Sequence, residues 1–216
     1  MTSRYRDGAR LVAPLAVAVV AFAISYGVLA RAAGMGVIAP IVMSATTFAG
    51  SAQFAVASIL GAGGGALAAI VAAVLLNARY APIGISVAPG FTGPWWRRLL
   101  GSQLVVDESW ALAARGGGRF DHRVLMGAGV TLYVVWNLGT AIGVFGAELV
   151  GDPERLGLDA AFPALFLALL VPQVRERRAL AAAVLGGAIA LALVPFTAAG
   201  VPIIAGAAAC LIGLRR

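Results

Sequence analysis

The stretch FAGSAQFAV, residues 48–56, places a glycine, a serine and a glutamine inside a long apolar run, just after a serine and two threonines. Glycine weakens a helix, and a primary amide such as that of Gln53 needs hydrogen-bond partners wherever it is buried. What this polarity means depends on what solvates the apolar residues around it, and the composition of the whole chain decides that.

The composition indicates that lipid is the solvent. Of the 216 residues, 61% are hydrophobic and 12% are charged, whereas soluble domains average about 45–50% apolar and about 25% charged residues. The first apolar run, 11–30, has the roughly 20 residues that a membrane span needs, without the cleavage pattern of a secretory signal. We therefore expect a multi-pass protein in the lipid bilayer of the bacterial cytoplasmic membrane.

The charged residues and the single cysteine and histidine narrow the function. The net charge is +7, but the arginines lie between apolar runs, where cytoplasmic loops gather positive charge, so we expect no nucleic acid partner. Cys210 alone can form neither an internal disulfide nor a cysteine metal cluster. His122 lies in an arginine-rich loop. We expect no metal, no cofactor and no catalytic residue.

The apolar runs predict an all-α fold. Hydrocarbon leaves backbone groups no partners outside the helix, and the strict alternation of strands is missing. We expect a transmembrane bundle of about seven spans, roughly six to eight. A cytoplasmic segment, 1–10, precedes a single transporter domain, 11–214. The runs are 11–30, 37–60, 66–91, 124–147, 158–172, 179–195 and 199–214, and 92–123 is expected to be a loop or an interfacial helix.

Arginine clusters predict which ends face the cytoplasm. The clusters expected inside are 115–123, 175–178 and 215–216. The acidic loop around Asp152 should lie outside. Arg4 and its neighbours also favour the cytoplasm, yet three plain spans within 11–91 would leave the next residues outside. Either one of these runs is broken or re-entrant, or 99–114 crosses the membrane as an eighth element.

A faint internal echo occurs at an offset of 116 residues, where Gly27-Val28-Leu29 aligns with Gly143-Val144-Phe145. Transporters are often built from two related halves. Short matches between strings rich in alanine and glycine also arise by chance. An internal repeat therefore stands as an open alternative to coincidence.

Two interpretations of residues 44–58 remain open. Small residues let membrane helices approach, and Ser or Thr can bond back to the previous turn, which would make the segment a packing surface. Alternatively the helix breaks near Gly50, and the freed amides at a half-helix N-terminus hold a carboxylate. Ser51 and Gln53 would then line a substrate site, with Phe48 and Phe54 as its apolar wall.

Charged side chains also fall at membrane depth. Arg79 lies midway along 66–91, where a cation costs about 2.5–3.5 kcal/mol and suggests a function in coupling or in a charge network. Asn77, close by, is expected to contact the substrate. The span could instead end at Leu76 with Arg79 reaching the interface, but the apolar residues that follow argue against this. Asp107 and Glu108 form an acidic pair that needs a cation if it is buried, and Arg79 is the candidate.

The string YVVWNLGTAIG, residues 133–143, is the last polar segment. Asn137 and Thr140 share one helical face, beside the helix-contact motif of Gly139 and Gly143. Packing between helices is the more direct explanation for these residues, and contact with a substrate is the alternative.

Five strings occur in the order seen in the AzlC-type branched-chain amino acid permeases: FAGSAQF, NARY, DESWALAA, WNLGTAIG and FPALFLALLVP. The chain resembles this family, the large subunit of two-component branched-chain amino acid exporters, from about residue 14 to 173. At the second string the family usually has a histidine where this chain has Tyr80. Any mechanism that needs an imidazole at this position is therefore in doubt.

The resemblance implies gradient-driven export of valine, leucine and isoleucine, with methionine as a further candidate, together with a small AzlD-type membrane subunit. It implies no use of ATP, and the chain has no phosphate loop. Asp107 or Glu108 could accept the ammonium of such a substrate. The alternatives are a channel-like or scaffold subunit, a permease for another small zwitterion or organic acid, and an intramembrane protease, for which the only histidine lies in a loop.

Topology provides the first test. In a Cys210→Ala background, Asp152→Cys should react with an impermeant maleimide on intact cells, and Arg177→Cys should be protected, because the arginine cluster is expected inside. Labelling at 177 but not at 152 would overturn the orientation.

Overall fold

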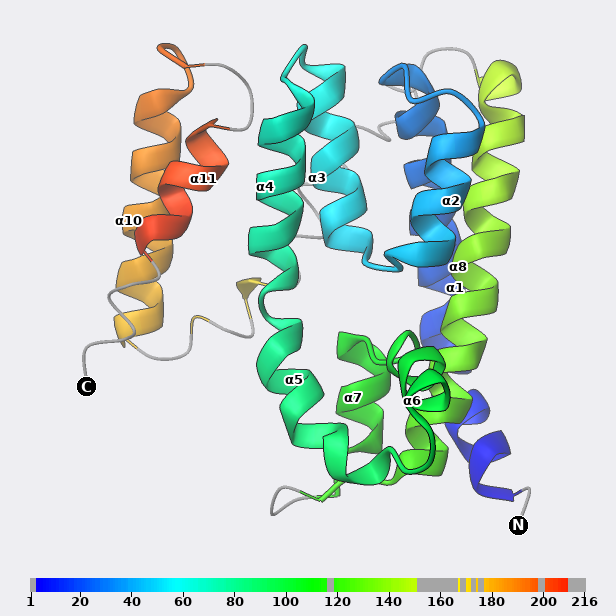
Figure 1. Cartoon of the computed structure of the whole chain (residues 1–216). Coiled ribbons are helices and arrows are strands. Elements are labelled where there is room, and N and C mark those ends of the chain that lie inside the picture. Colours follow the sequence, from blue (N-terminus) through cyan, green and yellow to red (C-terminus); the bar gives the residue numbers. More distant parts are fainter. Residues whose placement is uncertain are drawn as a thin grey trace.

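The computed structural model describes residues 3–115, 119–150, 177–197 and 201–209, together with residues 167, 170, 171 and 174. Within these ranges every regular element is a helix, which confirms the predicted all-α class there (Figure 1). The run 158–172 lies mostly outside the described residues. The helices are α1 (Ser3–Ala32), α2 (Ile38–Thr46), α3 (Gly50–Gly61), α4 (Ala66–Asn77), α5 (Tyr80–Val87), η1 (Ala88–Gly90), α6 (Trp95–Ser102), α7 (Asp107–Ala113), α8 (His122–Val150), α10 (Arg177–Leu193) and α11 (Val201–Ala207).

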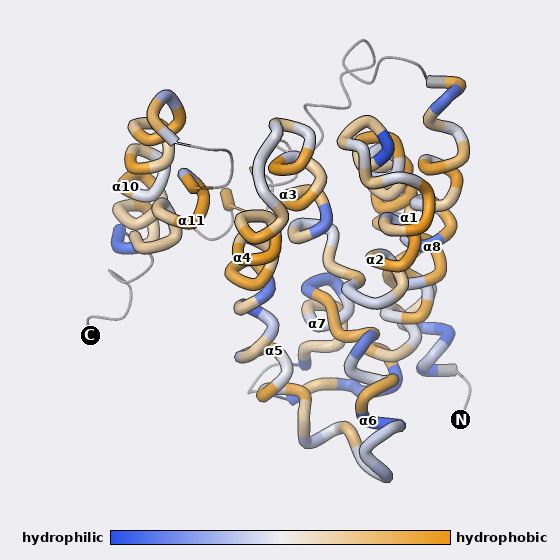
Figure 2. The backbone as a smooth tube through the Cα atoms, turned by 45° about the horizontal axis from the view of Figure 1, so that its top comes forward, coloured by the Kyte–Doolittle hydropathy of each residue, from blue (hydrophilic) through white to orange (hydrophobic). Residues whose placement is uncertain are grey.

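Three helices of the described ranges are long and apolar enough to cross a membrane: Arg4–Ala32, Ala66–Gly90 and His122–Leu149. Figure 2 shows a largely hydrophobic tube, with hydrophilic stretches near the N-terminus and around α6 and α7. The chain is therefore a helical membrane protein. The total of about seven spans stays a prediction, because part of the second half lies outside the described residues.

The predicted run 37–60 is not one span. α2 has nine residues and α3 has twelve, so they are roughly 14 and 18 Å long, short of the ~30 Å hydrocarbon core. Figure 1 shows α2 descending to mid-height and α3 returning. A Cβ on Gly61, at the end of α3, would lie 3.4 Å from Ala33, just after α1. The helix therefore breaks before Gly50, as predicted, and the two halves form a hairpin that enters and leaves at one end of the molecule.

α4 and α5 form one column through the molecule, interrupted at Ala78 and Arg79 (Figure 1). Pro82 explains the interruption, because it has no N–H for the carbonyl of Ala78 and its ring crowds that carbonyl. The N–H of Ala81 bonds to this carbonyl instead, at 3.1 Å. The helix thus continues past Arg79, which confirms that the span does not end at Leu76.

The described residues of 92–123, which leave out 116–118, form two short helices and no helix long enough to cross a membrane, and the interfacial position of the segment stays a prediction. α6 and α7 lie in the lower part of the molecule (Figure 1), and the turn between them reaches inward. There Gln103 Nε2 donates to the carbonyl oxygen of Thr46, at the inner end of α2, at 2.8 Å. At the other end of α7, the N–H of Asp121 bonds to the carbonyl of Ala113. The segment is a second hairpin, inserted from the end opposite to the first.

The two hairpins remove the conflict among the arginine clusters. Arg4 and Arg115 both pair with Asp121, at 3.3 and 3.7 Å, so the start of α1 and the start of α8 lie at one end. Because α2 and α3 return the chain to its entry side, α4 and α5 bring it back to this same end. Arg31 pairs with Glu148 at the opposite end, at 3.4 Å. An eighth crossing by 99–114 is not needed.

α1 and α8 run parallel and side by side (Figure 1). Glycines bring the two backbones together: a Cβ on Gly143 would collide with the carbonyl oxygen of Ile24, and one on Gly27 would lie 2.5 Å from that of Thr140. Gly27 and Gly143 are the residues that the internal echo aligned, and they lie against each other. Their shared packing role accounts for that part of the echo, and an internal repeat stays a prediction.

Gly143→Leu is expected to separate α8 from α1. Overpacking of this kind costs about 1–3 kcal/mol, so the amount of folded protein in the membrane and its melting temperature in detergent should both fall. Gly146→Leu is the matched control, because nothing lies within 4 Å of a Cβ at that position of the same helix. Equal levels and equal melting temperatures for the two variants would contradict this role of the α1–α8 contact.

Candidate functional site

The turn between α2 and α3 reverses the chain at mid-height. Phe48 adopts a φ of +43° there, in the left-handed region that residues with side chains rarely occupy, at a cost of about 1–3 kcal/mol. The Phe48 ring is buried and packs edge-on against Tyr133, with the ring centroids 5.0 Å apart. This contact holds the turn against α8.

Both broken helix ends find hydrogen-bond partners, as backbone groups in a dry interior must. At the end of α2, the Tyr133 hydroxyl donates to the carbonyl oxygen of Ala45 at 2.8 Å, beside the Gln103 contact described above. At the start of α3, the N–H of Ala49 donates to Oε1 of Gln53 at 3.2 Å. The partners come from α8, from the second hairpin and from α3 itself.

Gln53 is the centre of a buried polar network. Its Oε1 also accepts a hydrogen bond from Trp136 Nε1 at 3.0 Å, and its Nε2 donates to Ser44 Oγ at 2.7 Å. The Ser44 hydroxyl lies 2.8 Å from Thr140 Oγ1. Gln53, Ser44 and Thr140 are each 0% exposed. Their polar groups hold α2, α3 and α8 together, which favours the packing interpretation for Gln53 and Thr140.

A cavity of about 70 Å³ lies at the start of α3; we call it the inner cavity. Its predicted lining residues are Phe48, Gly50, Ser51, Arg79, Asp107 and Glu108. Its other lining residues are Val19, Phe22, Tyr80, Val106, Leu132 and Trp136. The structure therefore brings three of the polar segments into one space, and α1 and α8 add apolar walls.

Arg79 joins the tips of both hairpins. Its Nη2 atom lies 2.9 Å from Ser51 Oγ, in the first turn of α3. The same atom lies 2.8 Å from Oδ2 of Asp107, the first residue of α7, which confirms the predicted pairing of Arg79 with the acidic pair. The guanidinium also lies over the ring of Tyr80, 5.3 Å from its centroid.

Glu108 and Gly50 complete the polar side of the inner cavity. Glu108 lines it but forms no ion pair with the described part of the chain. A Cβ on Gly50 would lie 2.9 Å from Cη2 of Trp136, so glycine allows α3 to begin this close to the ring. The first N–H groups of α3 have no carbonyl partner earlier in the helix, and the helix dipole favours an anion there. One space thus offers a cation, an unpaired carboxylate and a helix start.

Besides Gln53 and Thr140, three predicted site residues are not among those that line the inner cavity. Phe54 is buried in the core against Tyr26, with the ring centroids 5.8 Å apart. Asn137 Nδ2 donates to the carbonyl oxygen of Tyr133 on its own helix, at 2.9 Å. Asn77 Oδ1 is buried without a hydrogen-bond partner among the described residues. Substrate contact by these three stays a prediction.

Sequence reasoning missed three aromatic residues of the inner cavity, Phe22, Tyr80 and Trp136. Trp136 stands next to Asn137, which drew attention because it is polar. Leu132, Trp136 and Thr140 are spaced at four residues and share one face of α8, and that spacing was the available signal. Tyr80 was noted only as a departure from the family pattern.

The fold and the site define a class: a helical membrane protein with charged side chains around a cavity at mid-height, as in membrane transport proteins. The family described as AzlC protein matches residues 14–150, and the chain belongs to it. The resemblance found in the sequence is therefore confirmed.

Three proteins of other organisms are similar in sequence to this chain. A protein of Archaeoglobus fulgidus described as an uncharacterized membrane protein is 31% identical over 96% of this chain and 93% of its own length. The branched-chain amino acid transport protein AzlC of Bacillus subtilis is 31% identical over 72% of this chain and 62% of its own length. The inner membrane protein YgaZ of Escherichia coli is 25% identical over 88% and 81%. No solved structure matches the chain.

Gln53→Leu tests the buried network. The substitution leaves the Ala49 N–H and Trp136 Nε1–H without their acceptor, and each unsatisfied buried group costs about 1–3 kcal/mol. Less folded protein in the membrane and a lower melting temperature are expected. Asn137→Leu is the matched control, because it removes the same amide group from a hydrogen bond within one helix. A Gln53→Leu protein as abundant and as stable as the wild type would show that the network is dispensable.

Proposed function

We propose that this protein transports branched-chain amino acids, exporting valine, leucine and isoleucine together with a small AzlD-type membrane subunit. The observation that carries the proposal is the inner cavity, where Arg79, the start of α3 and Glu108 lie within one partly apolar space. The Bacillus subtilis relative, which is named as a branched-chain amino acid transport protein, supports the same substrate class.

The inner cavity complements a branched zwitterion. The substrate carboxylate would lie at the start of α3, between the first-turn N–H groups and the guanidinium of Arg79. The ammonium would be held by Glu108. The branched side chain would pack against Phe22, Leu132 and Trp136, which line the same space.

The inner cavity is too small for this substrate without a change of shape. Its volume of about 70 Å³ lies well below the roughly 300–1,000 Å³ of ligand pockets. Arg79 provides a way to widen it, because an arginine fork has several donors and can exchange Asp107 for a substrate carboxylate. Release of Asp107 frees the tip of the second hairpin, so binding and opening become one event.

The charges favour an amino acid over an organic acid. An organic acid could bind Arg79 through its carboxylate but would leave Glu108 without a cation, whereas a zwitterion supplies an ammonium for Glu108. Without a phosphate loop, the gradient across the membrane is the energy source that we propose. The charged residues around the inner cavity likewise favour a transporter over a scaffold subunit.

Glu108→Gln tests the proposed function. Cells that lack their own exporters, express this chain with an AzlD-type subunit and are loaded with a valine-containing dipeptide should release valine. At matched membrane levels, Glu108→Gln should slow this efflux by about tenfold or more, because a hydrogen bond to a charged group contributes about 1.5–3 kcal/mol. Arg79→Lys should also slow it, because lysine lacks the planar fork.

Glu148→Gln is the matched control, because Glu148 is an exposed carboxylate paired with Arg31 at the far end of α8. It should export valine at the wild-type rate. Omission of the partner subunit should abolish export. Normal valine efflux by Glu108→Gln at equal protein level would remove Glu108 from the substrate site, and absence of valine efflux from the wild type with its partner would refute the proposed function.

A further inference from the structure

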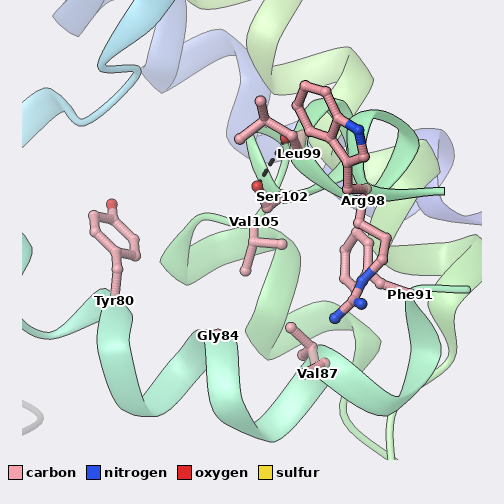
Figure 3. Close-up of a pocket in the computed structure, with 10 residues that line it drawn as sticks. Tyr80, Gly84, Val87, Phe91, Arg98, Leu99, Ser102 and Val105 are labelled. Carbon is pink, nitrogen blue, oxygen red and sulfur yellow. Dashed lines mark hydrogen bonds between the residues drawn. The ribbon is translucent and has the colours of Figure 1, made fainter.

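A second, larger cavity lies between α5, η1 and α6, with a volume of about 520 Å³. Figure 3 shows Tyr80 and Arg98 at its opposite ends, with Gly84 and Val87 along α5 and Val105 facing them. Apart from Ser102 its other walls are largely apolar, and among the described residues that line it Arg98 is the only charged one. We call this space the vestibule. Its volume lies in the range of ligand pockets, in contrast to that of the inner cavity.

The vestibule lies at the arginine-rich end of the protein. Gly90 of η1 lies in the chain between Ala88 and Phe91, two residues that line the vestibule. A Cβ on Gly90 would lie 3.3 Å from Nδ1 of His122, at the start of α8. α8 starts beside Asp121, to which Arg4 and Arg115 are paired. The positive-inside rule assigns this end to the cytoplasm, so the vestibule faces the side from which an exported substrate comes.

The vestibule and the inner cavity share a wall. Tyr80 lines both spaces, and the consecutive residues Val105 and Val106 line one each. The guanidinium of Arg79 lies over the Tyr80 ring. A movement of Arg79 away from Asp107 therefore changes what supports the ring that separates the two spaces.

We propose that the vestibule is the cytoplasmic entry site for the substrate, and that Tyr80 is the side chain that separates it from the inner cavity. The proposal rests on the proposed function and adds a first binding place and a direction of entry. The apolar walls suit a branched side chain, and Arg98 suits the carboxylate of an amino acid. The ring of Tyr80 gives way when Arg79 exchanges Asp107 for the substrate.

The alternative occupant of the vestibule is hydrocarbon from the bilayer. Access of a water-soluble reagent to the vestibule distinguishes this occupant from the substrate. Gly84→Cys, in a Cys210→Ala background, places a thiol in the vestibule, where nothing lies within 4 Å of the added Cβ. In inside-out membrane vesicles, an impermeant maleimide should label this cysteine, and saturating valine should slow the labelling. In intact cells the cysteine should stay unlabelled.

Any of three other labelling results would overturn the proposal that the vestibule is the entry site. A cysteine unlabelled from both sides indicates a lipid-filled crevice. Labelling in intact cells alone places the vestibule on the wrong side of the membrane. Labelling from the cytoplasmic side that valine does not slow shows a water-filled space that does not hold the substrate.

Gly84→Leu provides a functional test. The added side chain fills the vestibule without touching neighbouring atoms at its Cβ, and leucine is the better helix former. Membrane levels should be normal, and valine efflux should fall to that of cells without the protein. Gly146→Leu, the same change at another open position, should leave efflux unchanged.

The two proposals fail in different ways. If the wild type and Gly146→Leu export valine and Gly84→Leu does so equally well, the vestibule is not the entry path, while the proposed function stands. If the wild type with its partner exports no valine, the proposed function itself is refuted, and valine will not protect the cysteine at position 84.

Discussion

A broken helix in hydrocarbon exposes backbone groups that water cannot reach, and the centre of this molecule is arranged around one such break. Tyr133 and Gln103 bond to the carbonyls that end α2, and Gln53 accepts from the amide that precedes α3. These partners belong to α8, to the second hairpin and to α3. The backbone groups of the α2–α3 turn need hydrogen-bond partners, and this need determines how three parts of the chain meet. The inner cavity lies at their meeting point.

Arg79 shows how the need of polar groups in hydrocarbon for partners also shapes the inner cavity. A lone cation at this depth is unfavourable by about 2.5–3.5 kcal/mol, and its contacts to Ser51 and Asp107 offset that cost. Both contacts lie at hairpin tips, one from each end of the protein. A ligand that competes for the guanidinium thus acts on both hairpins at once. In the proposed function, binding and conformational change are thereby coupled through a single side chain.

The sequence was informative where polarity is unusual for its surroundings. Gly50 predicted a break, Arg79 at mid-run predicted a partner, and the acidic pair supplied one. The return of α3 was predicted only as one alternative, a broken or re-entrant run, because apolar residues at 37–60 suit a full span and a hairpin equally well. The partners of the break were not predictable either, because Gln103, Tyr133 and Trp136 are distant from it in sequence. Their roles arise only from the packing of the second hairpin and of α8.

The glycine contact between α1 and α8 limits how this protein can move. The two backbones touch where Gly27 meets Gly143, and again near the start of both helices, where a Cβ on Gly127 would collide with the carbonyl oxygen of Tyr5. They cannot slide or separate without losing packing at both levels together, so the two helices form one rigid body. In the transport cycle that we propose, this body stays fixed and the short hairpins beside it move. The barrier between the two membrane faces would then be carried by a few residues at the hairpin tips, in contrast to a cycle in which two halves of a bundle rock against each other.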